Sequence, residues 1–139
     1  MYNKVILLIE DNPRDEALTL RALKKSNIVN DIAIVRDGVE ALNYFSDENN
    51  LLPQLVLLDL KLPKIDGLEV LKQLRANPRT RGLPIVIFTS SSEEEDKIKS
   101  YQLGANSYVR KPVEFEQFLE ATKQLGVYWL VLNELPESV

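Results

Sequence analysis

Residues 55–59 read Leu-Val-Leu-Leu-Asp, a short apolar run that ends in a single carboxylate, Asp59. Residues 5–9 form a second apolar run, Val-Ile-Leu-Leu-Ile, which is followed by Glu10 and Asp11. If both runs are strands of one parallel sheet, their carboxyl ends lie at the same edge, where ligands of such sheets usually bind. The two runs therefore predict a crevice that holds three carboxylates.

Five short apolar or β-branched runs alternate with amphipathic stretches of helical period. This order indicates successive β-α units and a parallel sheet. Residues 55–58 and 85–88 are apolar throughout, which is typical of strands that helices cover on both faces. We therefore predict an α/β fold, a doubly wound five-stranded parallel sheet with five helices. The expected strands begin near Lys4, Asp31, Gln54, Pro84 and Asn106.

Most of the expected helices carry a recognisable cap. Asn12 precedes Pro13, and three other Asp or Ser residues stand three positions before a glutamate, which is the spacing of a capping box. Two helix ends are marked as well, by the pair at residues 77–78, Asn-Pro, and by Gly104, since glycine adopts the left-handed conformation without strain. The three capping-box pairs are Asp37 with Glu40, Asp66 with Glu69 and Ser92 with Glu95.

The composition limits the functions that the chain can have. We expect one domain, residues 1–139, that buries roughly two thirds of its unfolded surface. Cysteine and histidine are both absent, so the chain cannot form a disulfide, a thiolate zinc site or a phosphohistidine. The net charge of -4, with scattered Lys and Arg, argues against nucleic-acid binding. No apolar stretch approaches the roughly 20 residues of a membrane span, so we expect a cytoplasmic protein.

Polar groups of complementary chemistry end four of the five expected strands. Three neighbouring carboxylates repel one another unless a cation neutralises them. With no histidine or cysteine available, all-oxygen ligation favours Mg²⁺, with Mn²⁺ as the alternative. A carboxylate beside such an ion can attack phosphorus and form an acyl phosphate, while an ammonium and a hydroxyl hold other phosphoryl oxygens. The strand-end residues are Glu10, Asp11, Asp59, Thr89 and Lys111.

Six separated motifs resemble those of the receiver domain of two-component response regulators, over roughly residues 4–125. The resemblance implies a flavodoxin-like fold with strand order 2-1-3-4-5. It also implies that the protein is a signalling switch rather than an enzyme. The only steps that it would catalyse on itself are phosphoryl uptake and autodephosphorylation. The motifs are Glu10-Asp11, the lone Asp59, Leu62-Pro63 with Asp66-Gly67, Thr89-Ser90, Gly104-Ala105 and Lys111-Pro112.

The resemblance assigns a role to each acidic residue of the predicted crevice. Asp59 would accept a phosphoryl group from the phosphohistidine of a sensor histidine kinase. Glu10, Asp11, Asp59 and the backbone carbonyl of Lys61 would hold the divalent ion. The absence of histidine from this chain then agrees with a phosphoryl donor that is another protein.

Further roles implied by the resemblance concern the response to phosphorylation. Lys111 would contact the phosphoryl group. Thr89 would move toward it, and Tyr108 would turn inward to fill the space that Thr89 leaves. Lys61 and Ser91 occupy positions that affect how water reaches the acyl phosphate.

Two segments resemble a narrower group, the stand-alone response regulators of phytochrome-type histidine kinases, notably in cyanobacteria. They are residues 9–15, which read Ile-Glu-Asp-Asn-Pro-Arg-Asp, and residues 125–134 near the C-terminus. The resemblance implies a phytochrome-like kinase as the partner. It also implies that light is sensed by the kinase.

The C-terminal segment is expected to form a helix at about residues 114–135. Residues 127–132 are apolar on every side, and a single core-facing stripe cannot cover them all. We therefore expect a homodimer interface, with a lid over the domain's own core as the alternative. Output would be a contact with an unknown downstream protein, dimerisation, or onward transfer of phosphate. The predicted interface residues are Val127, Tyr128, Trp129 and Val131.

Two other functions fit parts of the same pattern. A haloacid-dehalogenase-like phosphatase also uses an aspartyl nucleophile with Mg²⁺ at a strand end. That chemistry usually has a second acid two residues after the nucleophile, where this chain has Lys61. A pseudo-receiver that never takes phosphate is the other alternative, but all the expected polar groups are present.

Overall fold

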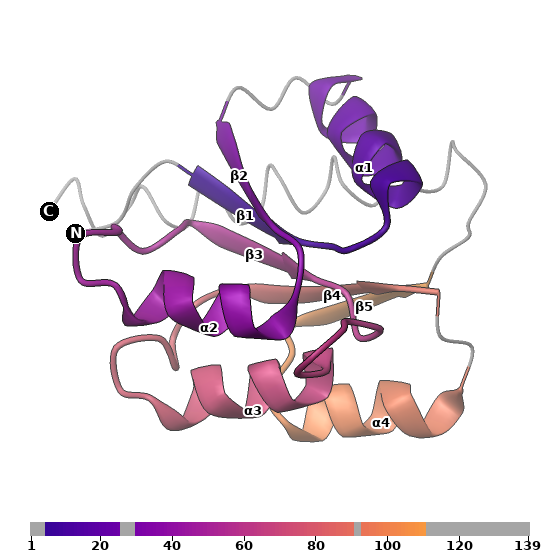
Figure 1. Cartoon of the computed structure of the whole chain (residues 1–139). Coiled ribbons are helices and arrows are strands. Elements are labelled where there is room, and N and C mark those ends of the chain that lie inside the picture. Colours follow the sequence, from indigo (N-terminus) through magenta and orange to yellow (C-terminus); the bar gives the residue numbers. More distant parts are fainter. Residues whose placement is uncertain (1–4, 26–29, 91–92, 111–139) are drawn as a thin grey trace, which may run out of the picture.

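The computed structural model describes residues 5–25, 30–90 and 93–110, which form a parallel sheet with helices on both faces (Figure 1). The strands are β1 (Val5–Ile9), β2 (Asp31–Val35), β3 (Leu55–Leu58), β4 (Ile85–Thr89) and β5 (Ser107–Arg110). The helices within these residues are α1 (Pro13–Lys25), α2 (Gly38–Ser46), α3 (Gly67–Ala76) and α4 (Glu94–Gln102).

The strand order is β2-β1-β3-β4-β5, and every neighbouring pair is parallel. This arrangement confirms the predicted doubly wound, flavodoxin-like sheet with order 2-1-3-4-5. Each strand begins at or next to the residue predicted from the sequence. The predicted fifth helix, at about residues 114–135, lies outside the described residues.

The hydrophobic core has two layers, one on each face of the sheet. Successive strand residues point to opposite faces, so β1 places Leu7 and Ile9 in one layer and Ile6 and Leu8 in the other. The first layer packs under α2 and α3, and the second packs under α1. Among the described helices in Figure 1, α1 covers one face of the sheet, whereas α2, α3 and α4 lie side by side on the opposite face. The continuous apolar runs of β3 and β4 are buried at every position, as the sequence predicted.

Three of the four predicted helix starts are confirmed. The Asn12 side chain accepts hydrogen bonds from the amides of Arg14 and Asp15, and α1 begins at Pro13. Asp37 and Asp66 are the N-caps of α2 and α3, and their side chains accept hydrogen bonds from the amides three residues later.

The predicted N-cap of α4, Ser92, is wrong by one residue. The helix begins at Glu94, with Glu93 as an N-cap that makes no side-chain cap hydrogen bond. Its first turn contains Glu94, Glu95 and Asp96, and negative charge at a helix N-terminus stabilises the helix dipole without a hydroxyl cap.

The predicted ends of α3 and α4 are confirmed. Asn77 is the C-cap of α3, and the following proline cannot continue the helix. Gly104 follows α4 with φ of 100°. The amides of Gly104 and Ala105 donate to the carbonyls of Tyr101 and Ser100, which is the hydrogen-bond pattern of a Schellman motif. Within the described residues, no helix combines the length and apolar character needed to cross a membrane.

Candidate metal and phosphoryl site

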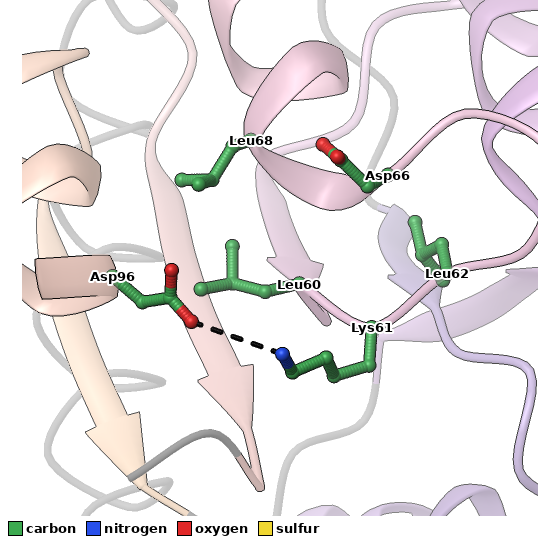
Figure 2. A pocket seen from close by; sticks show the side chains of 6 residues that line it. All are labelled: Leu60, Lys61, Leu62, Asp66, Leu68 and Asp96. Atoms are coloured by element: carbon green, nitrogen blue, oxygen red, sulfur yellow. Dashed lines mark ion pairs between the residues drawn. The ribbon is translucent and has the colours of Figure 1, made fainter. Parts of the chain in front are cut away.

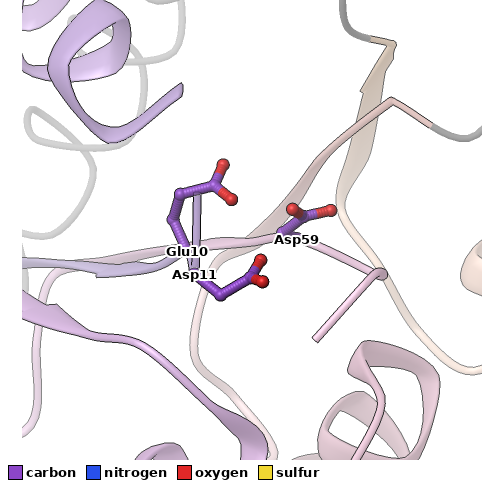
Figure 3. Close-up of side chains that lie close together, drawn as sticks. All are labelled: Glu10, Asp11 and Asp59. Atoms are coloured by element: carbon purple, nitrogen blue, oxygen red, sulfur yellow. The ribbon is translucent and has the colours of Figure 1, made fainter. Parts of the chain in front are cut away.

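Three carboxylates gather at the carboxyl-end edge of the sheet (Figure 3). Glu10 and Asp11 directly follow β1, and Asp59 directly follows β3, the next strand in the sheet. One carboxylate oxygen from each residue lies within 4.8 Å of the other two. Glu10 is 1% exposed and Asp59 is 4% exposed, whereas Asp11 is exposed to solvent. The three groups therefore form a largely buried acidic cluster that opens to water beside Asp11.

Backbone hydrogen bonds continue past the strand ends and fix the two buried acids. The Glu10 amide donates to the Val35 carbonyl at 3.0 Å, and the Asp59 amide donates to the Ile9 carbonyl at 3.0 Å. Because these bonds extend the ladders of the sheet, Glu10 and Asp59 have little freedom to move apart. The Glu10 carboxylate also accepts from the Asn12 amide at 3.3 Å, which directs this side chain along the start of α1.

The loop between β3 and α3 packs tightly behind Asp59. The Lys61 amide donates to Asp59 Oδ1 at 3.1 Å, and the Gly67 amide donates to the Leu60 carbonyl at 2.9 Å. A Cβ atom at Gly67 would collide with the carbonyl oxygen of Asp59. Only glycine therefore lets α3 begin this close to the candidate phosphoacceptor.

The start of α2 holds the same loop from its other side. The Gly38 amide donates to the Pro63 carbonyl at 3.3 Å, and a Cβ atom at Gly38 would collide with Ile65. Lys64, which has φ of 70°, forms an ion pair with Asp37 at 3.4 Å. The hydrogen bond from the Glu40 amide, with a smaller contribution from Lys64, lowers the pKa of Asp37. The loop that carries Lys61 is thus anchored to two helix N-termini.

The two predicted switch residues lie on the neighbouring strands. Thr89 is fully buried at the end of β4, which pairs with β3. Tyr108 lies opposite Ile87 in the register of β4 and β5, is partly buried and packs against the core layer of α2 and α3. Lys111 lies outside the described residues, as do the predicted interface residues Val127, Tyr128, Trp129 and Val131.

The donor set fits a hard divalent cation. All three side chains offer carboxylate oxygen, and the chain has no histidine or cysteine to provide a softer ligand. Like charges this close, two of them buried, destabilise one another unless protons or a cation neutralise them. Mg²⁺ needs only one or two protein carboxylates and keeps several waters, so an opening beside the exposed Asp11 suits it.

Sequence reasoning did not single out Asp96, although the structure brings it to the edge of this site. The Lys61 ammonium lies 3.9 Å from Asp96 Oδ2, across the gap between the β3–α3 loop and α4 (Figure 2). No spacing rule links these residues, because the contact depends on how the loop and the helix pack in three dimensions. The sequence offered only the acidic first turn of the helix as a signal.

A doubly wound sheet with a cluster of carboxylates at its carboxyl-end edge is the architecture expected of a phosphoacceptor switch. The chain belongs to the response regulator receiver domain family, whose model matches residues 6–123. Members of this family are signalling proteins, and this membership confirms the resemblance seen in the sequence.

Two relatives are especially informative. Response regulator Rcp1 of Synechocystis is 39% identical over 139 residues, which cover 97% of this chain and 95% of that protein. The Mn²⁺-bound crystal structure of Rcp1 has a TM-score of 0.82 and 38% identity and covers 91% of this chain and 94% of the other. The structure of the phosphorylated cyanobacterial phytochrome response regulator RcpA has a TM-score of 0.83 and 38% identity, with coverage of 92% and 94%.

The bacteriophytochrome response regulator AtBRR is also similar, with 50% identity and a TM-score of 0.75. The match covers 93% of this chain and 96% of that structure. This chain is therefore a receiver-domain response regulator that is close in sequence and fold to phytochrome response regulators, as the sequence predicted. It spans nearly the whole length of each of these relatives.

Proposed function

We propose that Asp59 accepts a phosphoryl group from the phosphohistidine of a sensor histidine kinase, and that this modification switches the conformation of the domain. The observation that carries the proposal is the convergence of Glu10, Asp11 and Asp59 at the ends of β1 and β3. In the transfer, a carboxylate oxygen of Asp59 forms the new bond to phosphorus. The phosphorus–nitrogen bond of the donor breaks, and the imidazole keeps the electron pair.

Mg²⁺, or Mn²⁺ in its place, would be held by Glu10, Asp11, Asp59 and the backbone carbonyl of Lys61. When bound, the ion neutralises negative charge on the carboxylates and the incoming phosphoryl group. The Mn²⁺-bound structure of Rcp1 supports this choice of ion. In this chain the sheet hydrogen bonds of Glu10 and Asp59 position the ligands, and the tight loop before α3 positions Lys61.

Three other side chains would act on the phosphoryl group or respond to it. Lys111 would contact one phosphoryl oxygen and the Thr89 hydroxyl would donate to another, while Tyr108 would turn inward as Thr89 moves. The burial of Thr89 on the strand next to β3 supports its part in this proposal. Hydrolysis of the acyl phosphate by the domain itself, an autodephosphorylation, would return the switch to its resting form.

The partner that we propose is a phytochrome-like sensor histidine kinase. The similarity to RcpA and AtBRR supports this choice. Phosphotransfer from such a kinase, followed in time with radiolabelled ATP, tests it. If acetyl phosphate labels Asp59 but the kinase does not, the choice of kinase is wrong and the phosphoacceptor assignment stands.

The proposal includes a single receiver domain over residues 1–139 in the cytoplasm, with no nucleic-acid partner and an unknown protein as the target. A net charge of -4 supports the absence of nucleic acid, and a chain without cysteine suits a reducing compartment. A helix at about residues 114–135 would form a homodimer through Val127, Tyr128, Trp129 and Val131. A wild-type chain that sediments as a monomer at micromolar concentration would contradict the dimer.

The phosphoacceptor is tested by incubation with acetyl phosphate and Mg²⁺ followed by intact-protein mass spectrometry. We expect one added phosphoryl group, removed by hydroxylamine as an acyl phosphate would be, and none on Asp59→Asn. The control is Asp66→Asn, which removes a carboxylate from the same loop but should keep the label. Labelling of Asp59→Asn at the wild-type level would show that another residue is the acceptor.

A further inference from the structure

Lys61 connects the candidate phosphoacceptor to helix α4 through two different groups. Its amide donates to Asp59 Oδ1 at 3.1 Å. Its ammonium lies 3.9 Å from Oδ2 of Asp96, which belongs to the first turn of α4 (Figure 2). A single residue therefore interacts both with the carboxylate that would be modified and with the first turn of α4.

The ion pair spans a hollow rather than a packed contact. The hollow has a volume of about 180 Å³ and lies between the β3–α3 loop, the start of α3 and the start of α4. Lys61 and Asp96 both line this hollow, so a charge pair across it can influence the distance between the loop and α4. The lining residues are Leu60, Lys61, Leu62, Asp66, Leu68 and Asp96.

The two partners of the pair differ in exposure to solvent. The Lys61 side chain is 59% exposed, whereas the Asp96 side chain is only 16% exposed. An ion pair at this separation and exposure is weak, and the flexible stem of a lysine lets its ammonium exchange between partners at small cost. Because the Lys61 amide donates a hydrogen bond to Asp59, the side chain of this lysine begins next to the acceptor carboxylate.

Phosphorylation would create a stronger competitor for the same ammonium. A phosphoryl group carries a charge of about -1.5 to -2 at neutral pH, compared with a single charge on Asp96. We propose that Asp96 is a positioning residue, which holds the Lys61 ammonium on α4 in the resting form. A phosphoryl group on Asp59 draws the ammonium away from Asp96 and so releases the first turn of α4. This inference rests on the proposed function only for the identity of the modified residue.

The first test measures the initial rate of labelling by acetyl phosphate with Mg²⁺. In Asp96→Asn the ammonium is free to attract the dianionic donor, so we expect the rate to rise roughly two- to fivefold, the range that a partly exposed ion pair supports. Asp96→Glu keeps a carboxylate and should restore the wild-type rate. Glu94→Gln removes a charge from the same helix turn and should change the rate much less.

A double-mutant cycle separates the ion pair from a general effect of charge. In a Lys61→Met background, Asp96→Asn should no longer raise the rate, because no ammonium remains to be released. An equal rise in both backgrounds would overturn the proposal, since the carboxylate would then act only through its own charge. The same conclusion would follow if Glu94→Gln raised the rate as much as Asp96→Asn.

The second test needs no phosphorylation, so it separates failure of this proposal from failure of the proposed function. Without phosphorylation, amide hydrogen exchange in α4 should be faster in Lys61→Met and in Asp96→Asn than in the wild type. In the double variant, exchange should be no faster than in the single variants. Exchange that is unchanged in Lys61→Met would overturn the proposal. A wild-type protein that takes no label from acetyl phosphate or kinase would instead contradict the role of Asp59.

Discussion

The two edges of the sheet differ in how their charged side chains are balanced. At the carboxyl-end edge, Glu10, Asp11 and Asp59 bring three like charges within 4.8 Å. At the amino-end edge, the partly buried Arg75 places one positive charge among oxygen atoms that the fold itself supplies. An internally balanced charge stabilises the fold, whereas a cluster of like charges makes a site that needs an ion from outside.

The Arg75 guanidinium ties together three segments near the starts of β4 and β5. Nε donates to the Gly104 carbonyl at 2.9 Å, and one terminal nitrogen donates to the carbonyls of Arg81 and Leu83 at 2.9 and 2.7 Å. The other terminal nitrogen donates to Asn106 Oδ1 at 2.9 Å. Burial lowers the pKa of Arg75, but an arginine pKa starts so high that the group stays charged at neutral pH.

The comparison predicts its largest stability effect at Arg75. Arg75→Met should lower the free energy of unfolding by roughly 2–4 kcal/mol, because several oxygen atoms lose a charged donor. Labelling of Asp59 should persist under conditions where the variant is folded. Urea denaturation measures the first effect, and Arg81→Met is the control, since its exposed side chain lies in the same region. Equal losses in the two variants would contradict the structural role of the Arg75 network.

A smaller effect on stability is expected at Asp66, whose carboxylate lies at the edge of the site and caps the N-terminus of α3. Its side chain accepts from the Glu69 amide at 3.0 Å. Asp66→Ala should cost about 1 kcal/mol of unfolding free energy, the usual value for a lost N-cap, while Mg²⁺-dependent labelling continues. Thermal unfolding and mass spectrometry measure the two properties. Loss of labelling in the folded variant would show that the site extends beyond the three clustered acids.

The smallest predicted effect on stability is its pH dependence at Asp37, whose carboxylate is stabilised by the Glu40 amide and by Lys64. The pKa of Asp37 is lowered from the usual value of 3.8. A lowered pKa in the folded state stabilises the protein above 3.8, and this contribution is lost as the pH falls through the folded value. The difference in melting temperature between wild type and Asp37→Asn should therefore shrink below about pH 4. A difference that stays constant down to pH 3 would exclude this linkage.

Much of the fold could be predicted because it depends on local patterns. The apolar runs at residues 55–58 and 85–88 are buried strands, and Asp37 and Asp66 cap helices as their spacing predicted. The acidic cluster followed from the same patterns, since parallel topology brings the ends of β1 and β3 together. The exception among the helix starts was α4, whose acidic first turn replaces a side-chain cap.

Other features depend on loop conformation and could not be predicted from sequence spacing. Gly67 was noted as part of a motif, but its close approach to the Asp59 carbonyl appears only in three dimensions. The Arg75 network joins residues up to 31 positions apart, and the contact of Lys61 with Asp96 joins a loop to a helix. In each case the partners share no periodic pattern in the sequence.

Binding of Mn²⁺, followed by electron paramagnetic resonance of the free ion, tests the central claim most directly. The account predicts one ion per chain, affinity lowered at least roughly tenfold in Asp11→Asn and in Asp59→Asn, and little change in Asp66→Asn. Equal affinity in the wild type, Asp11→Asn and Asp59→Asn would show that the clustered carboxylates do not form the metal site.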